Sequence, residues 1–160
     1  MNDTIASIQD LVEVVSRDHF PNPSASKEMI EDFESRNKVL LPSDVIYFYS
    51  QCNGAKLFQD FDAPFEIVPL DKLCPLADKF YEHICNEVLK HIYSMCLLRD
   101  RDFVGIELRT CTHGSDAAPI FDCFHEAFPE YSEEDVIAGS FTEFLAATLP
   151  LGGKKYWLIH

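Results

Sequence analysis

Positively charged residues are scarce in this chain. Its 160 residues include 13 Lys and Arg against 27 Asp and Glu, which gives a formal net charge of −14 at pH 7. Such a negative field repels the phosphate backbone of nucleic acids and the anionic surface of a membrane. We therefore expect neither as a partner. Two interpretations stay open: the acidity attracts a basic protein or a cation, or it only aids solubility.

Long apolar runs are also missing. Nothing in the sequence approaches the roughly 18 consecutive apolar residues that a membrane-spanning helix needs. The first residues, 1–4, include the acidic Asp3 at a place where a secretory signal has basic residues before an apolar run. The sequence therefore predicts a protein that stays in the cytoplasm.

Motifs of catalytic and metal sites are lacking as well. The sequence has no G-x-S-x-G, no H-E-x-x-H and no glycine-rich phosphate loop. Its six cysteines are widely spaced and form no C-x-x-C, and a chain with a large core does not need disulfides. We expect most of these cysteines to be buried thiols. We also expect no cofactor, no bound metal and no enzymatic activity.

Apolar residues, in contrast, are plentiful. They make up 47% of the chain and include 13 Phe, enough for the core of a single domain over residues 1–160.

Helical spacing predicts a first helix over residues 5–15, capped by Asp3 or Thr4. A second helix is expected from Ser24 or Ser26, and a third from Pro42 or Ser43 to the turn at Asn53-Gly54.

The second half of the chain switches to strand patterns. Short β-rich segments occupy residues 56–58, 65–68, 92–98, 103–108 and 119–124. A closing helix follows Ser140, which forms a capping-box pattern with Glu143. After it, Lys154 to Trp157 make a tail that can dock back onto the domain. Residues 70–90 are ambiguous because Pro75 interrupts a helical pattern. The sequence predicts an α+β fold: a mainly antiparallel sheet of about five or six strands, with N-terminal helices and a C-terminal helix packed against it.

The order of these segments resembles the SUKH superfamily, the group of Smi/Knr-like domains. Residues 41–54 are similar to its L-P-x-D entry helix, 103–108 and 120–126 to two of its strands, and 137–145 to its closing helix. The resemblance covers residues 25–158 and leaves 1–24 as an N-terminal helix extension. The residues that carry it are Pro42, Asn53, Gly54, Gly105, Asp122, His125, Glu126, Ser140, Phe141 and Phe144.

The resemblance implies a binding scaffold. Bacterial members are similar to immunity proteins, which are encoded beside a toxin and occlude it, often a nuclease. Fungal members look like regulatory interaction modules, which is the alternative for this chain. In either case the resemblance implies that Asp122 and Glu126 have structural roles. Fold alone does not decide function.

One acidic stretch is the candidate partner surface. No Lys or Arg occurs between Arg109 and Lys154, whereas eight carboxylates do. A surface of one sign speeds association with a partner of the other sign and weakens with salt. Nuclease clefts are basic because they hold phosphates. An acidic surface that enters such a cleft competes with the substrate. The alternative is that this acidic stretch is a solvent-exposed surface that binds no partner. The predicted partner-binding residues are Asp116, Glu130, Tyr131, Glu133, Glu134 and Asp135, while Phe124 is expected in the core.

A metal-dependent enzyme is the third candidate. Two Cys-x-His pairs, Cys111 with His113 and Cys123 with His125, could present four zinc ligands. Their spacing fits no known zinc module, so we expect buried thiols and hydrogen-bonded imidazoles. Asp122, His125 and Glu126 could also suggest acid–base chemistry, but no nucleophile or substrate-holding motif accompanies them.

Overall fold

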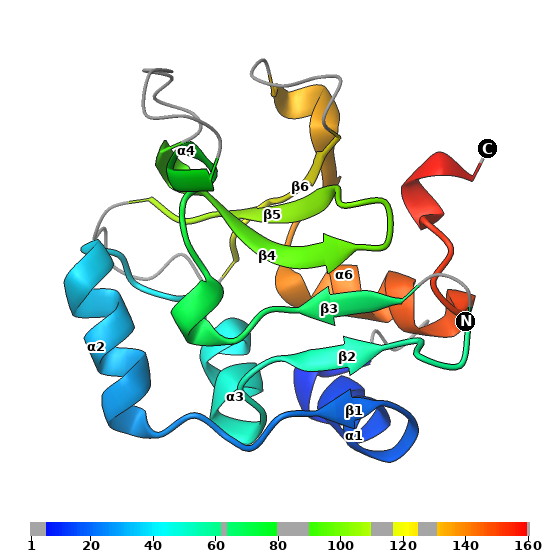
Figure 1. Cartoon of the computed structure of the whole chain (residues 1–160), viewed down its shortest axis with the longest axis horizontal. Helices are drawn as coiled ribbons and strands as arrows, with labels where there is room; N and C mark the ends of the chain where they lie inside the picture. The colour runs from blue at the N-terminus through cyan, green and yellow to red at the C-terminus, as the bar shows by residue number, and fades with distance from the viewer. Residues whose placement is uncertain (1–5, 62–63, 80–89, 110–116, 125–130, 160) are drawn as a thin grey trace.

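The computed structural model describes residues 6–61, 64–79, 90–109, 117–124 and 131–159. This part of the chain holds a seven-stranded sheet with helices packed on one face (Figure 1). The strands lie side by side in chain order, and all neighbours are antiparallel. The predicted α+β class is therefore confirmed. The strands are β1 (Phe20–Pro21), β2 (Ala55–Leu57), β3 (Phe65–Ile67), β4 (Ile92–Leu98), β5 (Phe103–Glu107), β6 (Ile120–Cys123) and β7 (Val136–Ala138).

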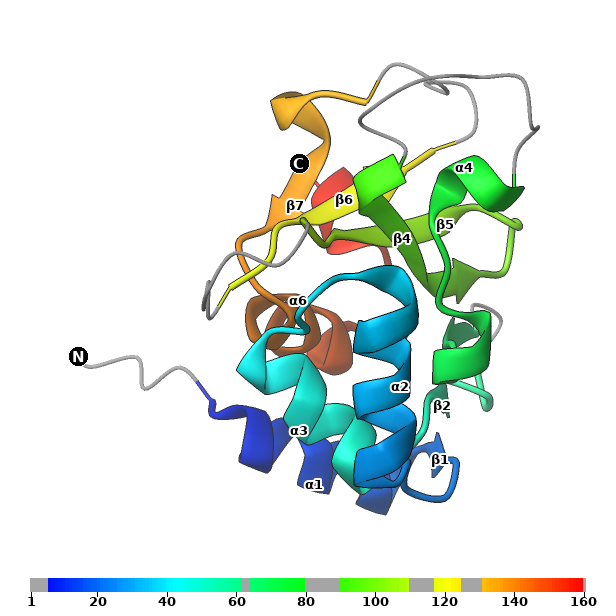
Figure 2. The ribbon, with the colours of Figure 1, turned by 90° about the vertical axis from the view of Figure 1, so that its left-hand side faces the viewer.

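The helices form the second layer. In Figures 1 and 2, α1 (Ile8–Asp18), α3 (Ser43–Gln51) and α6 (Phe141–Thr148) cover one face of the sheet, with α2 (Lys27–Asn37) beside α3. Among the helices described, none has both the length and the apolar character needed to cross a bilayer. Shorter helical turns are η1 (Leu70–Lys72), α4 (Leu76–Lys79), η3 (Glu133–Asp135), η4 (Leu149–Leu151) and η5 (Tyr156–Leu158).

For the first three helices, α1 to α3, the starts match the expected signals in two cases. Ser26 caps α2 by accepting a hydrogen bond from the Met29 N–H, and Pro42 stands at the N-cap of α3. The predicted start of the first helix was wrong. Ser7 rather than Asp3 or Thr4 is its cap, and α1 extends to Asp18. The reason is local: Ser7 and Asp10 bond reciprocally to each other's backbone N–H, which satisfies two donors at the helix start.

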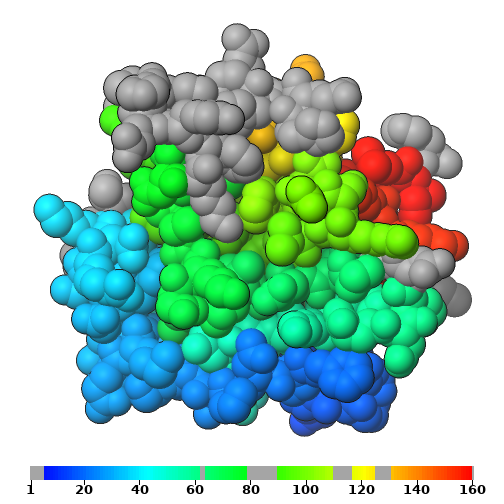
Figure 3. Space-filling view, viewed as in Figure 1, coloured from blue at the N-terminus to red at the C-terminus, as the bar shows by residue number. Residues whose placement is uncertain are grey.

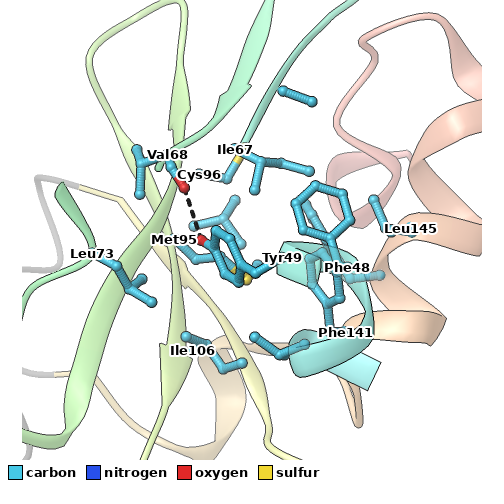
Figure 4. Packing of buried hydrophobic residues seen from close by; sticks show 14 of the residues in the cluster. Phe48, Tyr49, Ile67, Val68, Leu73, Met95, Cys96, Ile106, Phe141 and Leu145 are labelled. Atoms are coloured by element: carbon cyan, nitrogen blue, oxygen red, sulfur yellow. Dashed lines mark hydrogen bonds between the residues drawn. The ribbon is translucent and has the colours of Figure 1, made fainter. Parts of the chain in front are cut away.

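The main core lies between the helices and the inner face of the sheet (Figure 4). Phe48 of α3 meets Phe141 of α6 edge-to-face, with ring centroids 5.1 Å apart. Beside them Tyr49 is fully buried, and its hydroxyl donates a 2.8 Å hydrogen bond to the Val68 carbonyl. Burial strongly raises the pKa of Tyr49, so the phenol stays neutral. The buried face of α3, which includes Val45, Phe48 and Tyr49, is thus part of the core.

A smaller cluster covers part of the outer face of the sheet. In the space-filling view this face is turned to the reader, and strands β1 to β5 follow one another from blue to yellow-green (Figure 3). Leu76 of α4 packs there against the strands, as does Tyr131. Burial on both faces explains why β4 is buried along most of its length rather than alternating. The cluster consists of Leu76, Ile92, Phe121, Cys123 and Tyr131.

Two strands were missed by sequence reasoning. β1 has two residues, one of them Pro21, and β7 has three residues directly after an acidic turn. Neither is long enough to show alternation, and each is ordered by pairing with a neighbour distant in sequence. The ambiguous segment 70–90 yields η1 and α4, and residues 80–89 lie outside the described ranges.

Buried thiols account for the cysteines that the structure describes. Cys52, Cys96 and Cys123 are buried and Cys74 is half-buried, all as free thiols. Burial raises the pKa of Cys52 to about 12, so this thiol is protonated at neutral pH and a poor nucleophile. Cys85 and Cys111 lie outside the described ranges.

Candidate functional site

Asp44 joins the starts of two helices that are far apart in sequence. Its Oδ2 accepts hydrogen bonds from the backbone N–H and the hydroxyl of Thr142, both at 2.9 Å. Its Oδ1 accepts from the Val45 N–H at 2.9 Å. Asp44 is only 8% exposed. The carboxylate of the L-P-x-D pattern therefore binds N–H groups in the first turns of both α3 and α6, a role that the sequence did not indicate.

The start of α6 differs in one detail from the predicted capping box. Ser140 accepts a hydrogen bond from the Glu143 N–H at 3.1 Å, as expected. The Glu143 side chain, however, accepts from the Gly139 N–H at 2.8 Å rather than from Ser140. The helix then buries Phe141 and Phe144 completely, as their spacing predicted.

The Asn53-Gly54 turn holds the far end of α3. The Asn53 side chain accepts a hydrogen bond from the Leu70 N–H at 2.9 Å, which ties this turn to η1. Gly54 has φ +86°, and a Cβ placed there would lie 2.6 Å from the carbonyl oxygen of Ile67. Only glycine fits this left-handed position against the backbone. In the structure, Asn53 and Gly54 both hold this turn in place.

Gly105 has a different reason to be glycine. A Cβ at this position on β5 would lie 2.4 Å from Cγ2 of Ile92 and 2.9 Å from Sγ of Cys123. The missing side chain lets β4 and β6 bring these two residues together across β5 in the outer cluster. Gly105 therefore sets the packing of this cluster.

The acidic stretch separates into carboxylates that serve the fold and carboxylates that face solvent. Asp135 accepts a 2.7 Å hydrogen bond from the Ser132 N–H and so closes the η3 turn. Glu133 and Glu134 on the same turn are exposed. Within the described ranges, neither of their carboxylates accepts a hydrogen bond or pairs with a cation. Asp116, Glu126, Glu130 and His125 lie outside the described ranges.

The structure reverses the expected placement of two aromatic residues. Tyr131, predicted on the partner surface, is only 7% exposed and packs in the outer cluster. Its hydroxyl donates to the Phe124 carbonyl at 3.3 Å. Phe124, predicted in the core, is 38% exposed. The cause is that Tyr131 fills the space beside Cys123 and Phe121, while β6 ends before Phe124.

Asp122 lies on the inner face of β6, where the C-terminal segment covers the sheet. Burial raises its pKa, and the nearby charges of Asp102 and Asp135 act in the same direction. Lys155 and the indole of Trp157 partly oppose this shift. The Trp157 Nε1 is buried without a hydrogen bond of normal geometry, but it lies close enough to stabilise the carboxylate. The structure thus places Asp122 under the C-terminal segment, and the structural role that the resemblance implies for it stays a prediction.

The C-terminal segment docks back onto the fold, as expected. Lys155 pairs with Asp100 at 2.6 Å, and the Tyr156 hydroxyl donates to the Ile137 carbonyl of β7 at 2.7 Å. The Trp157 ring lies near that of Phe144 of α6, tilted by 39° with the ring centroids 6.4 Å apart. This segment closes the inner face of the sheet beside β7.

The zinc alternative rests largely on residues outside the described ranges, namely Cys111, His113 and His125. The remaining candidate, Cys123, is buried in the outer cluster, and burial raises the pKa of its thiol. Among the described residues, no group of three or more His, Cys, Asp or Glu is placed to hold a metal ion.

Comparison with known proteins shows what the chain is similar to. The model of the SMI1 / KNR4 family (SUKH-1) matches residues 24–147, from just before α2 to the last turn of α6. The chain is also similar to Immunity protein YokJ of Bacillus subtilis (strain 168). The two are 30% identical over 120 residues, which cover 74% of this chain and 70% of that relative.

Proposed function

The chain belongs to the SMI1 / KNR4 family (SUKH-1), and from that membership we propose that it is an immunity protein. It binds one cognate toxin domain and neutralises it by stoichiometric occlusion, without catalysing a reaction of its own. The observation that carries this proposal is its similarity to an immunity protein over 74% of its length. The resemblance of the motif segments supports the same reading.

The charge supports a basic partner. A net charge of −14 favours a toxin with a positively charged surface, and nucleases are one class of protein with such a cleft. An immunity protein that enters a basic cleft takes the place of the anionic substrate. Occlusion by shape and charge then suffices to block the toxin.

Among the residues proposed to bind the partner, those of the η3 turn are described by the structure. Glu133 and Glu134 face solvent, and the bond from Ser132 to Asp135 fixes the turn that presents them. Asp116 and Glu130 stay predicted members of this surface and lie outside the described ranges. Tyr131 and Asp135 were also predicted to bind the partner. In the structure Tyr131 is buried beside the η3 turn, and Asp135 bonds within the turn.

Co-expression tests the proposal. We expect the protein encoded beside the gene of this chain to stop growth when expressed alone, and growth to return when this chain is co-expressed. Purified together, the two should form a 1:1 complex. Growth arrest that persists with ample folded chain present, and no complex between the purified proteins, would contradict the proposal. If the complex dissociates at high salt and forms again at low salt, the result supports attraction between the acidic chain and a basic toxin.

A further inference from the structure

An open groove of about 980 Å³ lies beside η3. Its walls come from segments far apart in sequence: the α2–α3 connection on one side, and the end of β5, the start of β6 and β7 on the other. Figure 2 faces this side of the molecule and shows the α2–α3 connection below β6 and β7. Glu133 of η3 is one of its lining residues, so the groove and the proposed acidic surface are continuous.

The groove has an apolar lining that extends to its rim. Leu41, Leu108 and Phe121 are buried beneath it. On opposite walls Leu40 is 46% exposed and Val136 is 36% exposed. Single exposed apolar residues are common on protein surfaces, but two of them converging on one hollow resemble the centre of an interface.

Carboxylates surround this apolar lining. Glu34, Glu107 and Glu133 contribute to the walls, and Arg109 is the only cation among the described lining residues. Arg109 is already paired with Glu107. The groove therefore has an excess of negative charge, and positive groups placed along its rim gain favourable interactions.

Hydrogen bonds hold both walls in place without a partner. The Glu34 carboxylate accepts from the Leu41 N–H at 2.7 Å and so fixes the α2–α3 connection beside Leu40. On the other wall the Glu107 N–H donates to the Pro119 carbonyl at 3.0 Å. A groove formed in advance binds with a smaller loss of conformational entropy.

We propose that this groove is the anchor site for the toxin. It receives a projecting segment of the toxin that carries an apolar side chain flanked by Lys or Arg. The apolar side chain fills the space between Leu40 and Val136, and the flanking cations approach Glu133 and Glu34. This inference rests on the proposed function and adds to it where the complex is anchored and what chemistry the toxin presents there.

A matched pair of variants tests the anchor. Leu40→Ser removes an apolar side chain from the groove, and Met29→Ser removes one of nearly equal exposure, 44%, from α2 away from the groove lining. The probe is the purified, catalytically inactive form of the protein encoded beside this gene, titrated by calorimetry. We expect Leu40→Ser to weaken binding about tenfold or more and Met29→Ser to leave it unchanged.

A second variant fills the groove without removing any of its apolar lining or charge. Ser43 is exposed on the groove wall at the start of α3 and caps nothing with its side chain. Ser43→Trp should obstruct the site and weaken binding, while the melting temperature confirms that the fold is intact.

The outcomes separate the two claims. If the wild-type chain binds and neutralises the toxin while Leu40→Ser and Ser43→Trp bind as tightly as Met29→Ser, the anchor assignment is wrong and the proposed function stands. If the wild-type chain does not bind that protein, the proposed function fails and the anchor fails with it. A dimer of this chain that Leu40→Ser dissociates in sedimentation analysis would assign the groove to a second copy and overturn the proposal.

Discussion

Two regions of this molecule carry acidic side chains for opposite purposes. At the junction of α3 and α6, the Asp44 carboxylate is 8% exposed and accepts three hydrogen bonds. On the η3 turn, Glu133 and Glu134 face solvent, and the structure gives their carboxylates no partner within the ranges it describes. A count of charges treats the carboxylates of both regions alike. The difference shows that hydrogen-bond partners, rather than charge density, separate carboxylates that hold the fold from those available to another protein.

The largest expected effect is on the structural side, at the end of α3. Gly54→Ala places a Cβ 2.6 Å from the Ile67 carbonyl oxygen in a residue with φ +86°. Because the obstacle is backbone, it cannot rotate away. We expect a loss of about 3 kcal/mol or more in the free energy of unfolding, measured by urea denaturation. An unchanged midpoint would show that this turn relaxes freely.

Asp44→Ala should have the next largest effect. It leaves the N–H groups of Val45 and Thr142 without their acceptor in a buried place. We expect a loss of about 2–3 kcal/mol in the free energy of unfolding. The matched change Glu134→Ala, on an exposed carboxylate, should cost less than about 0.5 kcal/mol. Equal losses in the two variants would remove the distinction between the regions.

Charge reversal on the η3 turn should do the opposite of Asp44→Ala. Glu133→Lys with Glu134→Lys should weaken toxin binding about tenfold and leave the melting temperature nearly unchanged. The control is Glu13→Lys with Asp60→Lys, which changes the net charge equally but lies in α1 and the turn after β2, at the other end of the sheet. Equal weakening by both pairs would mean that net charge alone attracts the toxin.

The smallest expected effect is at Asp122. This carboxyl group is neither as well hydrogen-bonded as Asp44 nor as exposed as Glu133 and Glu134. Its pKa in the folded chain is raised above the ordinary value of 3.8 mainly by burial. Its contribution to stability is therefore fully present below pH 3.8 and is lost as the pH rises through the folded-state pKa. Asp122→Asn should stabilise the chain by less than about 1 kcal/mol at pH 7, and this gain should vanish in acid. A loss of stability at pH 7 would show that the attraction to Lys155 outweighs burial.

The sequence predicted the fold better than the site, for physical reasons. Helix α6 could be predicted because the cap at Ser140 and the spacing of Phe141 and Phe144 are local signals. The strands β1 and β7 could not, since their order comes from pairing rather than from their own residues. Sequence patterns also could not place Tyr131 inside and Phe124 outside, because the distinction depends on where β6 ends.

The groove was missed for a related reason. Leu40 and Val136 converge on one hollow only after the sheet has formed. One signal was available in the sequence: Leu40 and Leu41 are adjacent apolar residues just before Pro42. Neighbouring residues in an extended connection point in different directions, so at most one of them can face the core. The structure buries Leu41 and leaves Leu40 at the groove.

A titration of toxin activity tests the central claim most directly. Increasing amounts of the purified chain are added to a fixed amount of the active protein encoded beside it, and the remaining activity is followed over time. The account predicts that inhibition is complete at one chain per toxin and does not deepen with time, because binding alone neutralises the toxin. Progressive inactivation by a small fraction of one equivalent would show catalysis and contradict the account, as would full activity in excess chain.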